Sequence, residues 1–248
     1  MTEAEEALLR AEFDRRALAN PRLEYRHPAI MEKVFDRMQV ARAERSLDIG
    51  CGSGWATRRL AQMASEGLAV GMDISDEMIR LARRLSVALE NCMFVSGAAD
   101  EIPWQEDFFS LALSVDSAFY WPDPAAAASE IRRILSPGGR LVLLLSYFRE
   151  NPMHKRWQGL FRVPVHLKAG AEWAELFAAI GFEAVRHEQI TDESPVEPGF
   201  APSEFYPTPE DKLAFRRAGA LLIEARKPVL RPGSQPPAAP HTPLVVLE

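Results

Sequence analysis

Cysteine is scarce in this sequence, since only Cys51 and Cys92 occur among 248 residues. The two do not form a CxxC pair, and no Cys/His ligand spacing surrounds them. Neither a disulfide framework nor a structural zinc site is therefore indicated. We expect reduced thiols and no metal site.

An excess of positive charge is also lacking. The 29 Lys and Arg residues are outnumbered by 35 Asp and Glu residues, which gives a formal net charge of −6. Proteins that bind a phosphate backbone normally present a strong positive field. We therefore expect no nucleic-acid partner.

Long hydrophobic runs are absent as well. No apolar run approaches the roughly 20 residues that a membrane-spanning helix needs. The first 16 residues, MTEAEEALLRAEFDRR, are acidic and helix-patterned rather than basic and then apolar as in a secretory signal. We expect no membrane span and a cytoplasmic protein.

What the sequence does contain is enough apolar material for a large core, since 47% of its residues are hydrophobic. Strand-like runs alternate with helical patterns along the chain. The expected strands are 46–49, 68–72, 93–95, 111–115 and 141–145, and the helices between them are 55–65, 76–89 and 124–135. This alternation predicts right-handed crossovers and a parallel sheet.

Further elements are expected at both ends of this alternating region. Two helices should precede the first strand, the first closed by Asn20-Pro21. A helix around 173–180 should end at Gly181, followed by strands at 182–190 and 218–225. We expect Asp76 to cap the helix that follows it and residues 136–139 to stop the helix before them.

The central motif is a glycine-rich turn between a strand and a helix, read as SLDIGCGSGW over residues 46–55. Glycine lets the backbone bend sharply and lets a ligand approach the main chain. Trp55 stands where the third glycine of a dinucleotide motif would fall, so a nicotinamide or flavin cofactor is disfavoured. A tight turn without any ligand is the alternative for this motif taken alone.

A carboxylate is placed to cooperate with this turn. Asp73 ends the next expected strand, about 20 residues beyond the glycines, where an acidic side chain can accept hydrogen bonds from ribose hydroxyls. Two further segments follow, FVSGAADEIPW at 94–104 and IRRILSPGGRL at 131–141. A small-residue turn like the first can admit a flat purine.

In order and spacing these segments resemble the type 11 methyltransferase domain, a class I S-adenosylmethionine-dependent family that includes the ubiquinone and menaquinone C-methyltransferases. The resemblance covers roughly residues 25–147. It implies an α/β fold with a Rossmann-like seven-stranded, mostly parallel sheet, helices on both faces and an antiparallel edge strand. It also implies S-adenosylmethionine as the cofactor.

The resemblance carries a set of cofactor-binding residues. These are Asp48, Gly50, Cys51, Gly52, Gly54, Asp73, Ile74, Met78, Ala98, Ala99, Asp100 and Val115. Ala98 departs from the family pattern, which usually has an adenine-binding Asp there, so either the backbone or Asp100 must replace it. Ser110 also stands where the family usually has Asp, and we expect a structural consequence only.

The acceptor is expected to be a small molecule, aromatic or apolar, methylated on oxygen, nitrogen or carbon. The Asn/Asp-Pro-Pro-Tyr signature of enzymes that methylate nucleobase amines is absent after the fourth strand. Candidate catalytic residues are His154 as a general base and Tyr120. Candidate acceptor-binding residues are Tyr25, Trp121, Tyr147 and Trp157.

The expected organisation has three parts. Residues 1–42 form helices that cover the cofactor site, 43–227 form the methyltransferase domain with insertions near 147–170 and 191–210, and 228–248 form a flexible Pro-rich tail. A non-catalytic S-adenosylmethionine-binding module is the first alternative function, and a nucleotide-dependent oxidoreductase is the second. Fold-level resemblance does not choose an acceptor.

Overall fold

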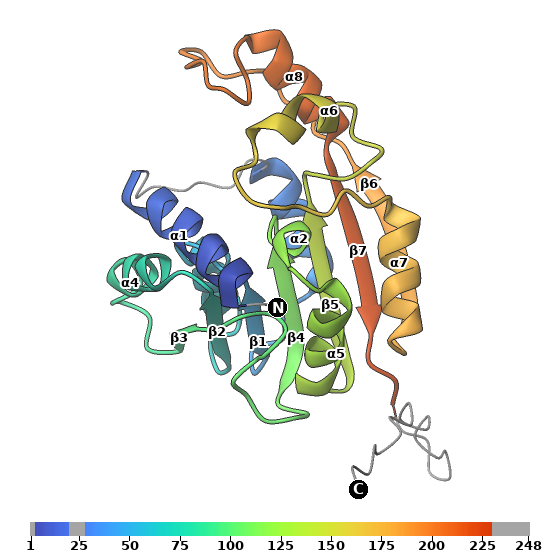
Figure 1. The fold of residues 1–248 in the computed structure, drawn as a ribbon. Helices are drawn as coiled ribbons and strands as arrows, with labels where there is room; N and C mark the ends of the chain where they lie inside the picture. The colour runs from blue at the N-terminus through green and yellow to red at the C-terminus, as the bar shows by residue number, and fades with distance from the viewer. Residues whose placement is uncertain (1–2, 20–27, 230–248) are drawn as a thin grey trace, which may run out of the picture.

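The computed structural model describes residues 3–19 and 28–229, which form one seven-stranded sheet with helices on both faces (Figure 1). The strands are β1 (Arg45–Ile49), β2 (Leu68–Asp73), β3 (Cys92–Ser96), β4 (Phe109–Val115), β5 (Leu135–Leu145), β6 (Glu183–Ile190) and β7 (Ala220–Arg226). Their order across the sheet is β3-β2-β1-β4-β5-β7-β6. The predicted fold class is confirmed.

Strand directions follow the predicted pattern. The five strands from β3 to β5 pair in parallel, whereas β7 pairs antiparallel with both of its neighbours. The antiparallel strand is thus β7, which lies between β5 and the edge strand β6. The order reverses beside β1, because the chain runs outward through β2 and β3 and returns to β4 on the other side of β1. Open α/β sheets bind ligands at such a switch point, beyond the carboxyl ends of the strands.

The helices bury two apolar layers against the sheet. They are α1 (Glu3–Ala19), α2 (Pro28–Met38), α3 (Trp55–Met63), α4 (Asp76–Leu85), α5 (Pro124–Ile134), α6 (His154–Trp157), α7 (Gly170–Ala179) and α8 (Pro209–Ala218), with short 3-10 turns η1 (Ala118–Tyr120) and η2 (Gln158–Leu160). Successive β4 side chains divide between the layers: Leu111 and Leu113 pack with α2 and α3, and Ala112 packs on the opposite face with α5. This is the two-residue alternation of a strand buried on both faces.

Several local predictions need correction. Ser75, rather than Asp76, caps α4, because its hydroxyl accepts a 3.1 Å hydrogen bond from the Met78 amide. That helix ends at Leu85, earlier than predicted. Residues 136–139 do not form a separate stop, since α5 ends at Ile134 and β5 begins at once. The helix α8 was not predicted; Thr208 caps it and Pro209 occupies its first turn.

The two insertions pack against each other beyond the carboxyl end of β5, where Figure 1 shows α6 beside α8. Trp157 of α6 contacts Phe215 of α8 with ring centroids 5.1 Å apart, and Arg156 pairs with Asp211. The amino-terminal helix α1 instead packs on α4, at the other side of the site. Within the described residues, we find no helix with the length and hydrophobicity to cross a membrane.

Candidate functional site

A pocket opens at the carboxyl ends of β1, β2 and β4, where the strand order reverses. It holds about 1200 Å³ of empty space, part of it open to solvent. The glycine loop after β1, the end of β2, the turn 97–100 and the residues after β4 form its walls. Helix α1 closes one side with Leu9, Phe13 and Arg16.

The three glycines of the loop have different neighbours. Gly50, Gly52 and Gly54 all have positive φ, at 74°, 53° and 78°. A Cβ at Gly52 would meet nothing within 4 Å, so this backbone faces open space in the pocket. A Cβ at Gly50 would lie 2.0 Å from Ser117 Oγ, and one at Gly54 would lie 2.5 Å from the Phe94 ring. Gly52 is thus the glycine that leaves room for a ligand, whereas the other two permit close packing.

Asp73 joins the glycine loop to the start of α4. One carboxylate oxygen accepts a 2.8 Å hydrogen bond from the Gly52 amide, and the other accepts a 3.0 Å bond from the Ser75 amide. Burial raises the pKa of Asp73 to about 6, against the lowering effect of these backbone bonds. The carboxylate lines the pocket, as the sequence predicts for a ribose-binding group.

Asp48 lies beneath the loop and does not line the pocket. The Thr57 hydroxyl donates a 2.7 Å hydrogen bond to its carboxylate, which ties β1 to the first turn of α3. Burial raises the pKa of Asp48 to about 7, although the bond from Thr57 lowers it. This geometry supports a role in holding the loop rather than contacting a ligand.

Ten of the twelve residues predicted to bind the cofactor line this pocket. They are Gly50, Cys51, Gly52, Asp73, Ile74, Met78, Ala98, Ala99, Asp100 and Val115. Gly54 is the second exception beside Asp48, because it packs against Phe94 at the start of α3. Burial raises the pKa of the Cys51 thiol well above its ordinary value, so the thiol is protonated and no nucleophile.

The residues predicted for the acceptor divide into two groups. Tyr120 and Trp121 line the pocket, whereas Tyr147, His154 and Trp157 do not. Tyr25 lies outside the described residues.

The packing of the second group explains its position. Tyr147 contacts Phe119 and Phe161, with centroids 5.5 and 4.7 Å apart, behind the pocket wall. Trp157 is fully buried among the rings that join the two insertions, and His154 contacts the Asn151 carbonyl at 2.7 Å. These three side chains therefore lie outside the lining of this pocket, and their role toward an acceptor stays a prediction.

Sequence reasoning missed the contribution of α1. Leu9, Phe13 and Arg16 are spaced i, i+4 and i+7, which places them on one helix face. This spacing indicates that the three residues share one helix face, whereas the prediction from the sequence is only that the helix covers the cofactor site. The helix is held over the site because Arg10 donates a 2.6 Å bond to the Ile74 carbonyl and Ser75 donates a 2.5 Å bond to Asp14.

Asp116, directly after β4, also lines the pocket and adopts a positive φ of 52°. Its two carboxylate oxygens accept bonds from the Ser146 amide at 2.6 Å and the Ser146 hydroxyl at 2.8 Å. Non-glycine residues in this conformation occur where surrounding contacts enforce it, often at functional sites. Across residues 3–19 and 28–229, no group of three His, Cys, Asp or Glu side chains is arranged to hold a metal ion.

The family comparison agrees with this geometry, since residues 47–143 match the family model described as a methyltransferase domain. This part of the chain is therefore similar to the methyltransferase domain of that family. The demethylmenaquinone methyltransferase of Staphylococcus aureus (strain MRSA252) is 28% identical over 136 residues, which are 54% of this chain and 56% of that protein. The chain thus spans about half the length of the curated relatives it matches.

Solved structures extend the likeness to nearly the whole chain. A structure of the Haloferax volcanii Trm112 methyltransferase activator bound to its partner, described as a methyltransferase, gives a TM-score of 0.79 with 28% identity. The match covers 90% of this chain and 99% of that one. The [4+2]-cyclase SpnF, at TM-score 0.63 and 22% identity over 81% of this chain and 80% of its own, shares the fold alone.

S-adenosylmethionine is the cofactor that this domain family implies, and the residues present fit it. The open backbone face at Gly52 leaves room for the amino-acid part, and the buried Asp73 carboxylate can accept bonds from ribose hydroxyls. The small side chains of Ala98 and Ala99 leave a gap for a flat base.

Proposed function

We propose that this methyltransferase domain transfers a methyl group from S-adenosylmethionine to a small-molecule acceptor. The observation that carries the proposal is the pocket in which the Gly52 backbone, the Asp73 carboxylate and the aromatic residues after β4 line one cavity. One cavity thus has a part that can hold the cofactor and an apolar part that can hold the acceptor, as transfer of a group between two substrates requires.

The cofactor-binding roles of individual residues are part of this proposal. Gly50, Cys51 and Gly52 would hold the methionine part, and Asp73 the ribose. Ile74 and Met78 would lie against the adenine, with the turn 98–100 at its edge. The cofactor, when bound, supplies a methyl group activated by its sulfonium.

The chain itself would position the acceptor and exclude water. Phe13, Phe119 and Trp121 give the pocket an apolar wall, and α1 covers it. Holding two reactants in near-attack geometry can supply about 7–11 kcal/mol of the barrier. Tyr120, whose hydroxyl accepts a 3.1 Å bond from Arg16, remains the candidate for contact with the acceptor heteroatom.

Formation of S-adenosylhomocysteine tests this function. The purified protein is incubated with methyl-labelled S-adenosylmethionine and a fractionated small-metabolite extract, with Asp73→Ala as the inactive control. The proposal expects label in an acceptor fraction and stoichiometric S-adenosylhomocysteine. Cofactor binding without any transfer, across all fractions, would instead support the non-catalytic binding module.

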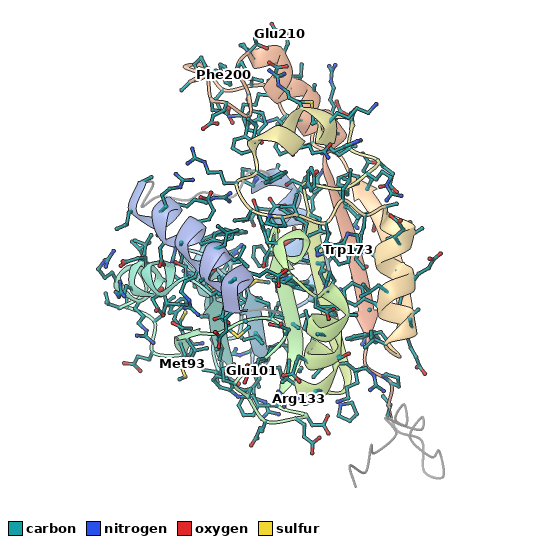
Figure 2. The ribbon with its side chains drawn as sticks, in the orientation of Figure 1. Met93, Glu101, Arg133, Trp173, Phe200 and Glu210 are labelled. Atoms are coloured by element: carbon teal, nitrogen blue, oxygen red, sulfur yellow. The ribbon has the colours of Figure 1, made fainter. Side chains whose placement is uncertain are left out.

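We also propose an activator subunit as a partner, because a structural neighbour forms a complex with Trm112. The favouring observation is the β3 edge of the sheet, where β3 pairs with β2 alone among the described strands. Met93 of β3 is 46% exposed, and Figure 2 labels it beside this edge. Leu85 at the end of α4 and Val87 in the loop that leads to β3 are 50% and 87% exposed. An exposed strand edge with apolar side chains is suited to strand addition by a partner.

Titration of the purified Haloferax volcanii activator into this protein tests the partner proposal. Binding to the wild type that is lost in Met93→Asp supports it. An unchanged affinity in that variant, or no binding to the wild type, contradicts it.

A further inference from the structure

The pocket contains an isolated positive charge. Arg16 is the one basic side chain among the described residues that line it, and it projects from α1 with 21% of its side chain exposed. The other charged residues of the lining are Asp73, Asp100, Asp116 and Asp123. A cation in an otherwise acidic, partly apolar cavity needs an explanation in terms of a ligand or a structural partner.

Its structural partner does not neutralise it. Glu12, which is buried, accepts bonds from both Arg15 and Arg16, with Glu12 oxygens 2.8 Å from a nitrogen of each. Burial acts to raise the pKa of Glu12, but the bonds from the two guanidinium groups outweigh it and lower this pKa. One ionised carboxylate therefore faces two cations, which leaves the trio with one positive charge in excess.

Toward the described residues, Arg16 also has donors without a hydrogen-bond partner. A guanidinium has five N–H groups. The Arg16 Nε bonds Glu12 and its Nη1 bonds the Tyr120 hydroxyl at 3.1 Å, so the described residues account for two of the five. Arg15 is 47% exposed and does not line the pocket, which leaves Arg16 as the group that carries the excess charge to the cavity.

Aromatic rings surround this cation. The guanidinium carbon lies 4.8 Å from the Phe13 ring centroid and 5.4 Å from that of Tyr120. The two rings meet edge to face, with centroids 5.1 Å apart at 89°. Rings at this distance restrict water around the charge, which strengthens its attraction for an anion.

We propose that the acceptor is an aromatic acid, whose ring packs against Phe13 and Tyr120 and whose carboxylate binds Arg16. A guanidinium offers paired N–H groups that match a carboxylate, and the adjacent rings match an aromatic body. Arg16 is then a residue that determines specificity for the acceptor. This inference rests on the proposed function, because it names the acceptor class of the same pocket.

The amino-acid carboxylate of the cofactor has the same chemistry, so the first experiment separates the two sources. Dissociation constants of S-adenosylhomocysteine and of methylthioadenosine, which lacks the amino-acid part, are measured for wild type and Arg16→Gln. The proposal expects both constants to stay within about twofold, because Arg16 does not serve the cofactor. A loss of affinity for S-adenosylhomocysteine alone would overturn it.

The second experiment uses the full chain saturated with S-adenosylhomocysteine. Calorimetric titrations compare 4-hydroxybenzoate, 4-aminobenzoate and salicylate with the matching carboxamides. We expect at least one acid to bind about tenfold or more tightly than its amide, as a charge-assisted hydrogen bond provides. Arg16→Gln should remove this preference and Arg16→Lys should retain part of it.

The control is Arg15→Gln, which removes the other cation of the trio without altering the pocket lining. It lowers the excess charge of the trio but keeps the Arg16 N–H donors in the pocket, so most of the preference for the acid should persist. Binding of no aromatic acid, equal binding of acids and amides, or equal loss in both variants would overturn the inference. If the wild type fails to bind S-adenosylhomocysteine at all, the proposed function itself fails, and this result is distinguished in the first experiment.

Discussion

The Gly52 amide donates a 2.8 Å hydrogen bond to the Asp73 carboxylate, so the glycine loop and the end of the neighbouring strand are directly joined. The sequence predicts that both residues contact a ligand, but it does not predict that they contact each other. Because Asp73 also accepts the Ser75 amide, its orientation is fixed before a ligand binds. A preorganised carboxylate binds at a smaller entropic cost.

Replacing Asp73 should weaken cofactor binding while the fold persists. Asp73→Ala removes a charge-assisted acceptor, for which a loss of about 1.5–3 kcal/mol in the binding free energy of S-adenosylhomocysteine is expected. Calorimetry measures the loss. Asp76→Ala is the matched control, since Asp76 lies three residues away and does not line the pocket. If both variants bind S-adenosylhomocysteine with equal affinity, Asp73 does not contact the cofactor.

A side chain at Gly52 should block the pocket. Gly52→Val places its branched carbons where no atom lies within 4 Å, and the positive φ adds strain of about 1–2 kcal/mol. We expect a folded, moderately destabilised protein that no longer binds S-adenosylhomocysteine. Gly50→Ala should instead act mainly on stability, because its Cβ meets Ser117. Thermal unfolding with and without the ligand separates these effects, and a ligand-induced shift in Gly52→Val would contradict the assignment.

The buried carboxylates make stability depend on pH. The pKa of Asp48 is raised to about 7 from 3.8, so the folded protein keeps this proton to a higher pH than the unfolded chain does. Between about pH 4 and 7 the folded state binds more protons, and the free energy of unfolding falls as pH rises. Asp73 adds to this fall up to about pH 6.

Asp48→Asn removes its share of that dependence. Urea unfolding at pH 4, 5, 6 and 7 should give a shallower decline for the variant than for the wild type. Asp107→Asn serves as the comparison, because Asp107 is half exposed and pairs with Lys227 at the surface. If the free energy of unfolding falls with pH equally steeply in Asp48→Asn and in the wild type, the prediction is wrong.

Trp157 is predicted to act through packing rather than acceptor binding. It is fully buried and contacts Phe215 across the two insertions, so Trp157→Ala should cost about 3–5 kcal/mol of unfolding free energy. The affinity for S-adenosylhomocysteine of the protein that remains folded should be unchanged. Trp121 lies at the pocket wall, so Trp121→Ala should change ligand binding more than it changes the free energy of unfolding. If the Trp157→Ala protein is as stable as the wild type but binds the ligand differently, Trp157 belongs to the binding site and the packing role is wrong.

The sheet was predictable because its strands are short apolar runs between clear helical patterns. Leu111–Leu113 pack on both faces of the sheet, and such residues read as a continuous apolar run in the sequence. The position of β7 between β5 and β6 was harder to predict from the sequence, because it depends on where the chain re-enters the sheet after α8. That helix was hidden in a Pro-rich segment, although Thr208-Pro209 is a helix-start signal.

The cofactor half of the pocket was predictable since its residues follow strands at fixed distances. The acceptor half was not, because aromatic content does not tell whether a ring faces a cavity or packs inside. Tyr147 and Trp121 are equally aromatic, yet only Trp121 lines the pocket. The spacing of Leu9, Phe13 and Arg16 marks one face of α1, but Arg16 reaches the site through the docking of α1 on residues 74–77, a long-range contact that this spacing does not specify.

The central claim is that this pocket binds an adenosyl amino acid. Calorimetric titration of the purified chain with S-adenosylhomocysteine, and separately with NAD, tests it most directly. The account predicts saturable binding of one S-adenosylhomocysteine per chain, lost in Gly52→Val, and no saturable binding of NAD. Binding of NAD in preference, or S-adenosylhomocysteine binding that survives in Gly52→Val, would contradict it.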